Sequence, residues 1–406
     1  MYKINIKILS TLALLASITT GLHANSISDW TEEEVNSLKH MWIKSLPPLE
    51  DDMSNRYANN PKAAALGKKL FFDSRFSSNG KVSCSSCHNP QLNFTDGKVR
   101  SQGIASTRRN SPGLLGTSYS KWFFWDGRAD SQWAQALGPL EDSREHGGNR
   151  SQYAHLIRQD KNYKSEYEAI FGLLPDISNL SRFPLSAGPV HEETANSNWL
   201  EMSRLDQEII TQIFVNLGKT LAAYERTLMP SASRLDQYIE AVMNGNSDNK
   251  ILNNEEVSGL KIFIGKGACV ICHNGPLFTT HEFKNIGLPR VEELGLDKGR
   301  FNGVKDALVS EFNCMGKYSD AKKSECLELR FVKTLRDETI GAFKIPSLRN
   351  VENTAPYMHA GQFKSLGDVL KHYQKRPITR NGHSDLLPNN LTDQDLKYLE
   401  AFLHTL

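Results

Sequence analysis

The chain has 406 residues, which is too long for one small electron carrier and suits two domains. Its formal net charge of +2, with charged residues mixed along the chain, does not indicate a nucleic-acid-binding protein. No strand-rich segment stands out, so the composition and periodicity predict a mainly α fold.

The N-terminus has the pattern of a cleaved secretory signal. Lys3 and Lys7 precede an apolar run from Ile8 to Ile18, which is too short to span a bilayer comfortably, and small residues follow up to Ala24. We therefore expect residues 1–24 to be removed, leaving a periplasmic protein without a membrane span.

Helical signals precede the first cysteine pair. Thr31 and Glu34 fit a capping box ahead of an apolar stripe, and a second helix is predicted over 61–70. Residues 74–97 are rich in Ser, Asn and Gly and predict an irregular loop.

That loop carries Cys84-Ser85-Ser86-Cys87-His88, and the same pattern returns as Cys269-Val270-Ile271-Cys272-His273. Two thiols three positions apart can add to the vinyl groups of a haem, and the adjoining histidine can ligate its iron. The pattern therefore predicts two covalent c-type haems. Two redox-active dithiols, or four thiolates around one structural zinc, are the alternatives.

Aromatic and acidic residues follow the first pattern. Trp122-Phe123-Phe124-Trp125 precedes Asp126-Gly127-Arg128, and such a cluster usually means packing. Gln135 and Glu145 flank Gly138-Pro139, which is typical of a turn, and an isolated acid such as Glu145 is ordinarily solvated. Residues 184–198 show no periodicity and predict an irregular insertion.

The remaining helices are predicted from apolar residues at helical spacing, and they span approximately 206–229, 235–243, 255–264, 366–373 and 392–404. The third of them leads into the second cysteine pattern, as 61–70 leads towards the first. This repetition predicts two related domains, 25–235 and 236–406. In a variant of this arrangement, the C-terminal helix packs back on the first domain.

Two cysteines remain outside the repeated pattern. Cys314 and Cys326 lie in the polar stretch 290–340, which predicts a surface excursion. In an oxidising compartment we expect a disulfide between them, with a zinc site or free thiols as alternatives.

From about Leu66 to its end, the chain resembles the bacterial di-haem cytochrome c peroxidase superfamily, which includes the MauG proteins. The supporting motifs are Cys84-x-x-Cys87-His88, Phe124-Trp125-Asp126-Gly127-Arg128, Gln135-Ala136-Leu137-Gly138-Pro139, Pro346-Ser347-Leu348-Arg349-Asn350 and Ala355-Pro356-Tyr357-Met358-His359-Ala360-Gly361. The resemblance implies two cytochrome c-like domains, each with one haem, and a Ca²⁺ ion between the haems.

The resemblance also implies roles for individual residues. His88 would be the proximal ligand of the peroxide-reactive haem, and His273 that of the electron-transfer haem. Trp125 would lie between the haems, while Gln135 and Glu145 would lie over the reactive iron. Glu145 would act as the general acid-base group on peroxide.

Asn110, Thr354 and Pro356 match the family's calcium ligands, the last two through backbone carbonyls, which suits a cation that prefers oxygen.

Two departures from many family peroxidases favour the MauG-like branch. No histidine occurs between His88 and His146, so the first iron should be open unless His146 folds back. At the family position of the second haem's distal methionine, fourteen residues after His359, this chain has Tyr373, which the resemblance makes a candidate iron ligand. The alternative is that Tyr373 is a core residue on an amphipathic helix. His372 would point about 100° away on a helix and is the weaker ligand candidate. His359 is expected near the second haem without ligating it.

The sequence therefore predicts a MauG-like enzyme that reduces hydrogen peroxide at the first haem and draws electrons through the second from a redox protein or protein substrate. A detoxifying peroxidase with a small cytochrome or cupredoxin donor, and a non-catalytic di-haem electron carrier, are the alternatives. The identity of the donor is not predicted.

Overall fold

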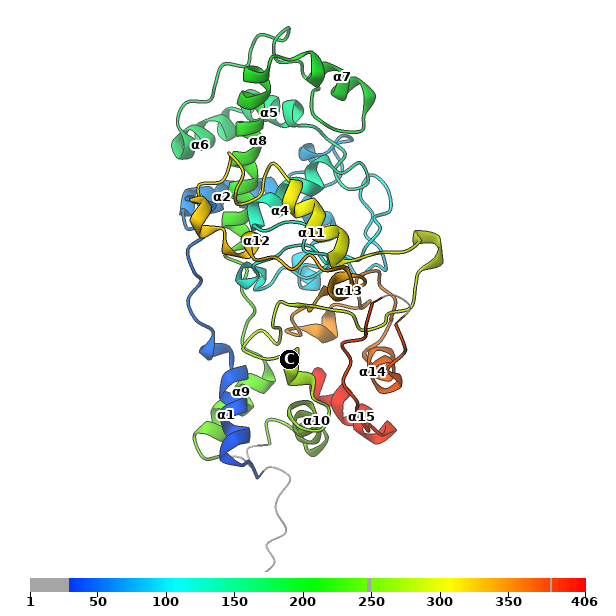
Figure 1. Cartoon of the computed structure of the whole chain (residues 1–406). Coiled ribbons are helices and arrows are strands. Elements are labelled where there is room, and N and C mark those ends of the chain that lie inside the picture. Colours follow the sequence, from blue (N-terminus) through cyan, green and yellow to red (C-terminus); the bar gives the residue numbers. More distant parts are fainter. Residues whose placement is uncertain (1–28, 247–249, 380–381) are drawn as a thin grey trace, which may run out of the picture.

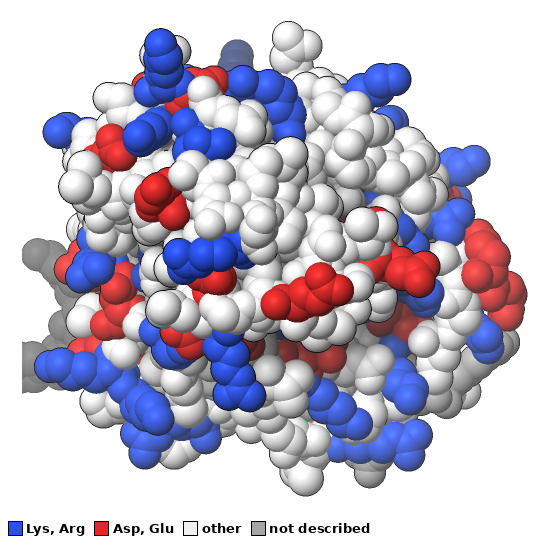
Figure 2. Space-filling view, turned by 90° about the horizontal axis from the view of Figure 1, so that it is seen from above, with Lys and Arg blue, Asp and Glu red and all other residues white. Residues whose placement is uncertain are grey.

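The computed structural model describes residues 29–246, 250–379 and 382–406, so the predicted signal peptide lies outside the described residues. The described chain is mainly helical, as predicted, and its sheet consists of two short antiparallel strands, β1 (Phe283–Lys284) and β2 (Phe343–Lys344). Within these ranges, no helix has both the length and the apolar character needed to cross a membrane. Basic and acidic side chains are interspersed over the face shown in Figure 2.

One half of the molecule is built around the long helix α8 (Arg204–Glu225), which the apolar periodicity predicted. Its buried side packs in a hydrophobic core with residues between Leu66 and Tyr224 and with Phe312 and Tyr318. Around α8 in Figure 1 lie α2 (Pro61–Phe72), α4 (Gln132–Glu141), α5 (Arg150–Gln159), α6 (Lys161–Phe171) and α7 (Glu193–Glu201). The short helix α3 (Cys84–Cys87) contacts α2.

The other half has its own core, which contains Leu38 and Met41 together with residues between Leu235 and Leu406. Its helices occupy the opposite end of the molecule in Figure 1: α1 (Glu32–Met41), α9 (Arg234–Met243), α10 (Asn254–Ile264), α14 (Leu366–Lys375) and α15 (Asp393–Leu403). Although α1 is the first described helix, it packs against α9 in the second half, and not in the 25–235 unit predicted to contain it. The helix α15 packs against α10 and α14, so the predicted variant with a C-terminal helix on the first half is wrong.

The helix that leads to each cysteine pattern crosses a core helix at a glycine. A Cβ on Gly67 of α2 would lie 1.9 Å from the carbonyl oxygen of Thr220 in α8. A Cβ on Gly259 of α10 would lie 1.9 Å from the carbonyl oxygen of Tyr398 in α15. Only glycine permits such close helix contacts, so each helix needs a glycine at its crossing point. The predicted relation between the two halves stays a prediction.

The segment 290–340 is only partly a surface excursion. It contains α11 (Arg300–Val309), α12 (Leu327–Arg330) and α13 (Arg336–Thr339). Arg300 is buried against the ring of Trp122 and donates to the carbonyl oxygen of Gly127 at 2.7 Å, so α11 is fixed to the first half. Cys314 and Cys326 form the predicted disulfide, which excludes the zinc and free-thiol alternatives for this pair.

Two local predictions were wrong. Gly138 and Pro139 lie inside α4 and do not form a turn, because Ser131 caps the helix and its apolar side is buried. The expected irregular insertion 184–198 contains the start of α7, whose first amides bond to the Glu192 carboxylate. In both cases a side-chain cap and tertiary burial outweigh weak local propensity.

Candidate functional site

Both cysteine patterns line one cavity of about 1070 Å³ between the two halves. Cys87 and His88 contribute from the first half, and Cys269, Cys272 and His273 contribute from the second. Cys84 lines a small adjoining cavity, together with Cys87 and His88. Two chain segments about 180 positions apart in sequence thus line the same cavity.

Both histidines are held through Nδ1, and His88 has a further contact with Ser111, whose Oγ lies 3.1 Å from Nδ1 and 3.4 Å from Nε2. The Nδ1 atom of His88 lies 2.9 Å from the carbonyl oxygen of Phe94, and that of His273 lies 3.0 Å from the carbonyl oxygen of Phe278. Such a bond fixes Nδ1 as the protonated nitrogen and leaves Nε2 with its lone pair for a metal. Phe94 and Phe278 both adopt positive φ, of 59° and 53°, which turns their carbonyls towards the rings.

The four thiols of the patterns are unpaired, as covalent haem attachment requires. Burial raises the pKa of Cys87 to about 11 and that of Cys269 to about 12. A redox-active Cys-x-x-Cys pair needs a lowered thiol pKa, so the dithiol alternative does not fit. Among the described residues, no group of three or more His, Cys, Asp or Glu side chains could hold a metal ion, which argues against a shared zinc.

Gln135 and Glu145 line the same cavity as His88. Gln135 projects from α4, and Glu145 lies in the turn after it, where Ile104 donates its amide to the Glu145 carbonyl. Neither side chain hydrogen-bonds to any other part of the described chain, so both are available to a ligand. The structure therefore brings together the pair that the sequence placed ten positions apart.

Burial, and then the charge of Asp142, raise the pKa of Glu145 to about 7, against an opposing effect of Arg128. The Arg128 guanidinium lies 3.4 Å from the centre of the Phe124 ring, on the same wall. A carboxyl group with this pKa can both accept and donate a proton near neutral pH.

The loop that contains Gly103 packs against the backbone of Arg144 and Glu145. A Cβ on Gly103 would lie 2.5 Å from the carbonyl oxygens of both Arg144 and Glu145 and 2.8 Å from the Glu145 Cα. Because these are backbone atoms, a larger residue would displace Glu145. Gly103 was not among the predicted site residues.

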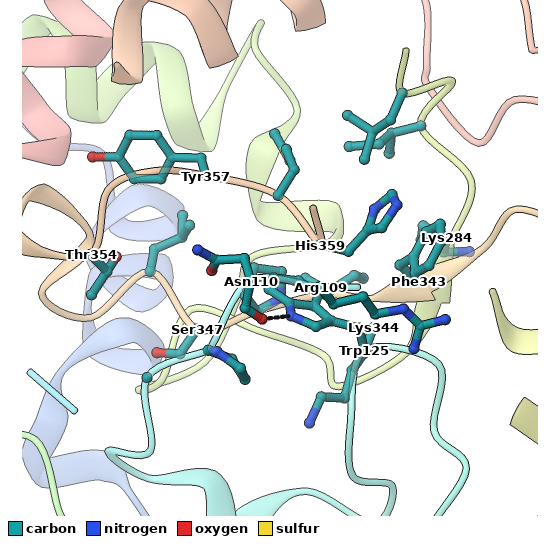
Figure 3. Close-up of a pocket in the computed structure, with 18 of the residues that line it drawn as sticks. Arg109, Asn110, Trp125, Lys284, Phe343, Lys344, Ser347, Thr354, Tyr357 and His359 are labelled. Carbon is teal, nitrogen blue, oxygen red and sulfur yellow. Dashed lines mark hydrogen bonds between the residues drawn. The ribbon is translucent and has the colours of Figure 1, made fainter. Parts of the chain in front are cut away.

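Trp125 lies in the wall where the two halves meet (Figure 3). Its indole nitrogen donates to the carbonyl oxygen of Asn110 at 2.9 Å, and its own carbonyl oxygen accepts from the amide of Lys344 at 2.8 Å. The first bond joins it to the first half and the second joins it to β2 of the second half. This fixed position is compatible with the predicted role between two haems.

Tyr373 and His372 are adjacent on α14 but have different surroundings. The Tyr373 side chain lines the cavity, and burial, followed by the neighbouring thiols of Cys269 and Cys272, raises its pKa. His372 lies outside the cavity lining and is bonded through Nε2 to the carbonyl oxygen of Ile286 at 2.7 Å. Of the two, Tyr373 is the one positioned to reach a group bound by the second pattern.

Two further histidines, His359 and His146, lie at the cavities. His359 lines the cavity and stacks on Phe343 with 3.6 Å between ring centres, and its buried Nδ1 has no hydrogen-bond partner in the described chain. His146 is buried with Nδ1 2.6 Å from the carbonyl oxygen of Phe76, and it lines only the small adjoining cavity. Whether the first iron is open stays a prediction.

Asn110, Thr354 and Pro356 all line the main cavity. The Asn110 side-chain nitrogen donates to the carbonyl oxygen of Lys98 at 2.7 Å, and Asn110 Oδ1 accepts no hydrogen bond from the described residues. An amide oxygen in that position can serve a cation, but the calcium site itself stays a prediction.

Two wall residues were not predicted from the sequence. Glu225, at the end of α8, is buried, accepts a hydrogen bond from Gln132 at 2.9 Å and has a pKa raised to about 7 by burial. Lys344 of β2 reaches the wall beside Trp125. Nothing in the local sequence marks either residue, because tertiary packing alone brings them to the cavity.

A model of the di-haem cytochrome c peroxidase family matches residues 61–244. The chain is 31% identical over 403 residues to cytochrome-c peroxidase IdrP1 of Denitromonas iodatirespirans, covering 97% of this chain and 93% of the relative. It is 30% identical to the methylamine utilization protein MauG of Methylorubrum extorquens, covering 94% and 88%. A crystal structure of a MauG-like protein associated with microbial copper homeostasis matches with a TM-score of 0.61 at 25% identity, covering 89% of this chain and 93% of that one.

Proposed function

The chain belongs to the di-haem cytochrome c peroxidase family, and from that premise we propose that it is a MauG-like, peroxide-dependent oxidase of the periplasm. As a member of this family it is a peroxidase-type oxidoreductase.

The residues of the two patterns fit one c-type haem each. Cys84 and Cys87 would attach the first haem and His88 would ligate it, while Cys269, Cys272 and His273 would do the same for the second. Once bound, each haem supplies an iron that can change oxidation state. The supporting observation is the pair of imidazoles with Nδ1 fixed and Nε2 left for the iron.

Glu145 moves the proton at the first site. Reduction of hydrogen peroxide to two water molecules consumes two electrons and two protons. The Glu145 carboxylate accepts the proton of the inner peroxide oxygen and returns it to the outer one, and the Gln135 amide orients the molecule by hydrogen bonding. The unpartnered side chains of these two residues, in one cavity with His88, are the observation that carries the proposal.

Trp125 and Tyr373 serve electron transfer at the second site. Trp125 is bonded to both halves and provides an aromatic ring between them. Burial disfavours an isolated Tyr373 phenolate, so the anion requires the positive charge of an iron. An anionic oxygen ligand favours a high oxidation state, whereas methionine favours the reduced one.

Asn110, Thr354 and Pro356 would hold one Ca²⁺ ion through oxygen atoms. Treatment of the purified protein with a chelator should remove one calcium per chain and alter the haem spectra. Retention of unchanged spectra in calcium-free protein would remove this part of the proposal.

The deciding experiment is an optical and electron paramagnetic resonance spectrum of the oxidised protein before and after peroxide. We expect one high-spin and one low-spin haem, and a long-lived oxidised product that decays when a protein substrate is supplied. Rapid turnover with reduced cytochrome c and no long-lived product would instead identify a detoxifying peroxidase. Two low-spin haems that do not react with peroxide would identify an electron carrier.

A further inference from the structure

Lys344 is a cation in the cavity wall for which the mechanism above has no use. It belongs to β2, which pairs with β1, and its backbone amide donates to Trp125. Its ammonium group contacts the first half, 3.0 Å from the carbonyl oxygen of Trp122 and 3.3 Å from Oγ of Ser120. Lys344 therefore lies where the two halves meet, beside Trp125 (Figure 3).

Both of these contacts are with uncharged groups. An ammonium group carries three donors, and the two oxygens use two of them. No carboxylate of the described chain lies within 4 Å of Lys344 Nζ. Burial is the cause that lowers the pKa of Lys344 to about 8, with no opposing acidic group.

Two other cations of the same wall have carboxylate partners. Arg109 bonds to Asp126 at 2.6 Å and to Asp297 at 2.8 Å, and Lys284 lies 3.5 Å from Asp385. Lys344 is part-buried and lines the cavity, and a cation held partly out of water is stabilised by an anionic partner. The missing partner of Lys344 is therefore expected from the contents of the cavity.

We propose that Lys344 is the counter-ion of a haem propionate at the junction of the two halves. This inference rests on the proposed function only in requiring that the cavity hold haem. A haem carries two carboxylates, and Lys344, which lines the cavity, keeps one donor that no described protein oxygen uses. The ion pair would join the second half, the first half and the cofactor at one point, next to Trp125.

The test uses the haem-loaded protein with Lys344→Gln, which keeps hydrogen-bonding capacity and removes the charge. An uncompensated propionate disfavours the reduced iron, so the midpoint potential of one haem should become more negative. We expect at least a tenfold change in its one-electron equilibrium, about 59 mV, with the other haem affected less. Lys344→Arg should restore most of the potential because it restores the charge.

Lys397→Gln is the matched control, since Lys397 is an exposed lysine of α15 outside the cavity lining. Water and salt screen such a charge, so both potentials should stay at their original values. Haem content, measured as the pyridine haemochrome, must be two per chain in every variant. Wild-type protein without covalent haem would contradict the proposed function itself.

Two results would overturn the inference while leaving the peroxidase function intact. The first is a Lys344→Gln protein with two haems and unchanged potentials. The second is a midpoint potential that depends on the concentration of added chloride or phosphate in wild type but not in Lys344→Gln, which would assign the site to a free anion. A propionate attached to the haem has a fixed local concentration, so its effect should not follow added anions.

Discussion

Replacement of Glu145 by Gln is the most direct perturbation of the first site. The change keeps the size of the side chain and removes its ability to exchange a proton. General acid-base groups typically contribute about 10²–10⁴-fold, so the rate of reaction with peroxide should fall by roughly that factor. Both haem spectra should stay unchanged, because Glu145 attaches neither haem.

The raised pKa of Glu145 sets the direction in which the peroxide reaction rate and the folding stability change with pH. The raised pKa of about 7 means that the carboxylate form of Glu145 forms only as pH rises through 7, so the wild-type rate should increase over that interval. Folding stability should move the opposite way. Since the pKa is 4.5 when the group is free, ionisation in the folded protein costs about 3 kcal/mol that is absent below pH 4.5 and fully present above 7. Glu145→Gln should therefore be more stable than wild type at pH 8 and equally stable at pH 4.

Stopped-flow mixing with peroxide between pH 5 and 9 measures the rate, and chemical denaturation measures the stability. Asp142→Asn is the control: it removes a negative charge that raises the pKa of Glu145, so the midpoint of the rate profile should move to lower pH. A Glu145→Gln protein that keeps a step near pH 7 and a rate within tenfold of wild type would refute the assignment. Glu225, with a pKa also raised to about 7, would then be the group to replace.

Three further changes test separate parts of the structure. Tyr373→Met should raise the midpoint potential of the second haem and bring its spectrum towards that of a His/Met cytochrome; potentiometry with an unchanged value would exclude Tyr373 as a ligand. Gly103→Ala places a Cβ 2.5 Å from backbone oxygens, so we expect a loss of about 1–3 kcal/mol and a slower peroxide reaction through displacement of Glu145, as measured by thermal unfolding and stopped flow. Arg349→Met leaves the buried Asp236 carboxylate without its ion-pair partner and should cost about 3–5 kcal/mol in denaturant unfolding, and a cost below 1 kcal/mol would contradict this account.

Helices with a strong apolar stripe were the predictable part of the fold. The structure confirms α8, α10 and α15 close to the expected bounds, and the capping box of Thr392 and Asp395 is present. The helices α5 and α6 were not predicted, although the apolar side of α6, with Tyr163 and Tyr167, has helical spacing; both helices are short, and polar residues separate their buried side chains. Their stability comes from tertiary contacts, which a single sequence does not display.

The residues of the site likewise fall into those that the sequence predicts and those that it does not. The two cysteine patterns are local in sequence, so the residues that face the cavity from them could be predicted. Gln135 and Glu145 required a family resemblance, because neither a glutamine in a helix nor an acid in a turn is distinctive alone. Glu225 and Lys344 could not be predicted at all, since only the packing of the two halves brings them to the wall.

The two patterns are nearly equivalent where they are built and unequal where they face the cavity. Each histidine is bonded through Nδ1 to the carbonyl oxygen of a phenylalanine in a positive-φ conformation. One local difference is the Ser111 hydroxyl beside the His88 ring. The difference at the cavity comes from the opposing helices: α4 and the turn after it place an amide and a titratable acid on one side, and α14 places a phenol on the other. Exchange of function between the sites would therefore require changes in α4 and α14, whereas a change within either cysteine pattern should affect haem attachment at that site alone.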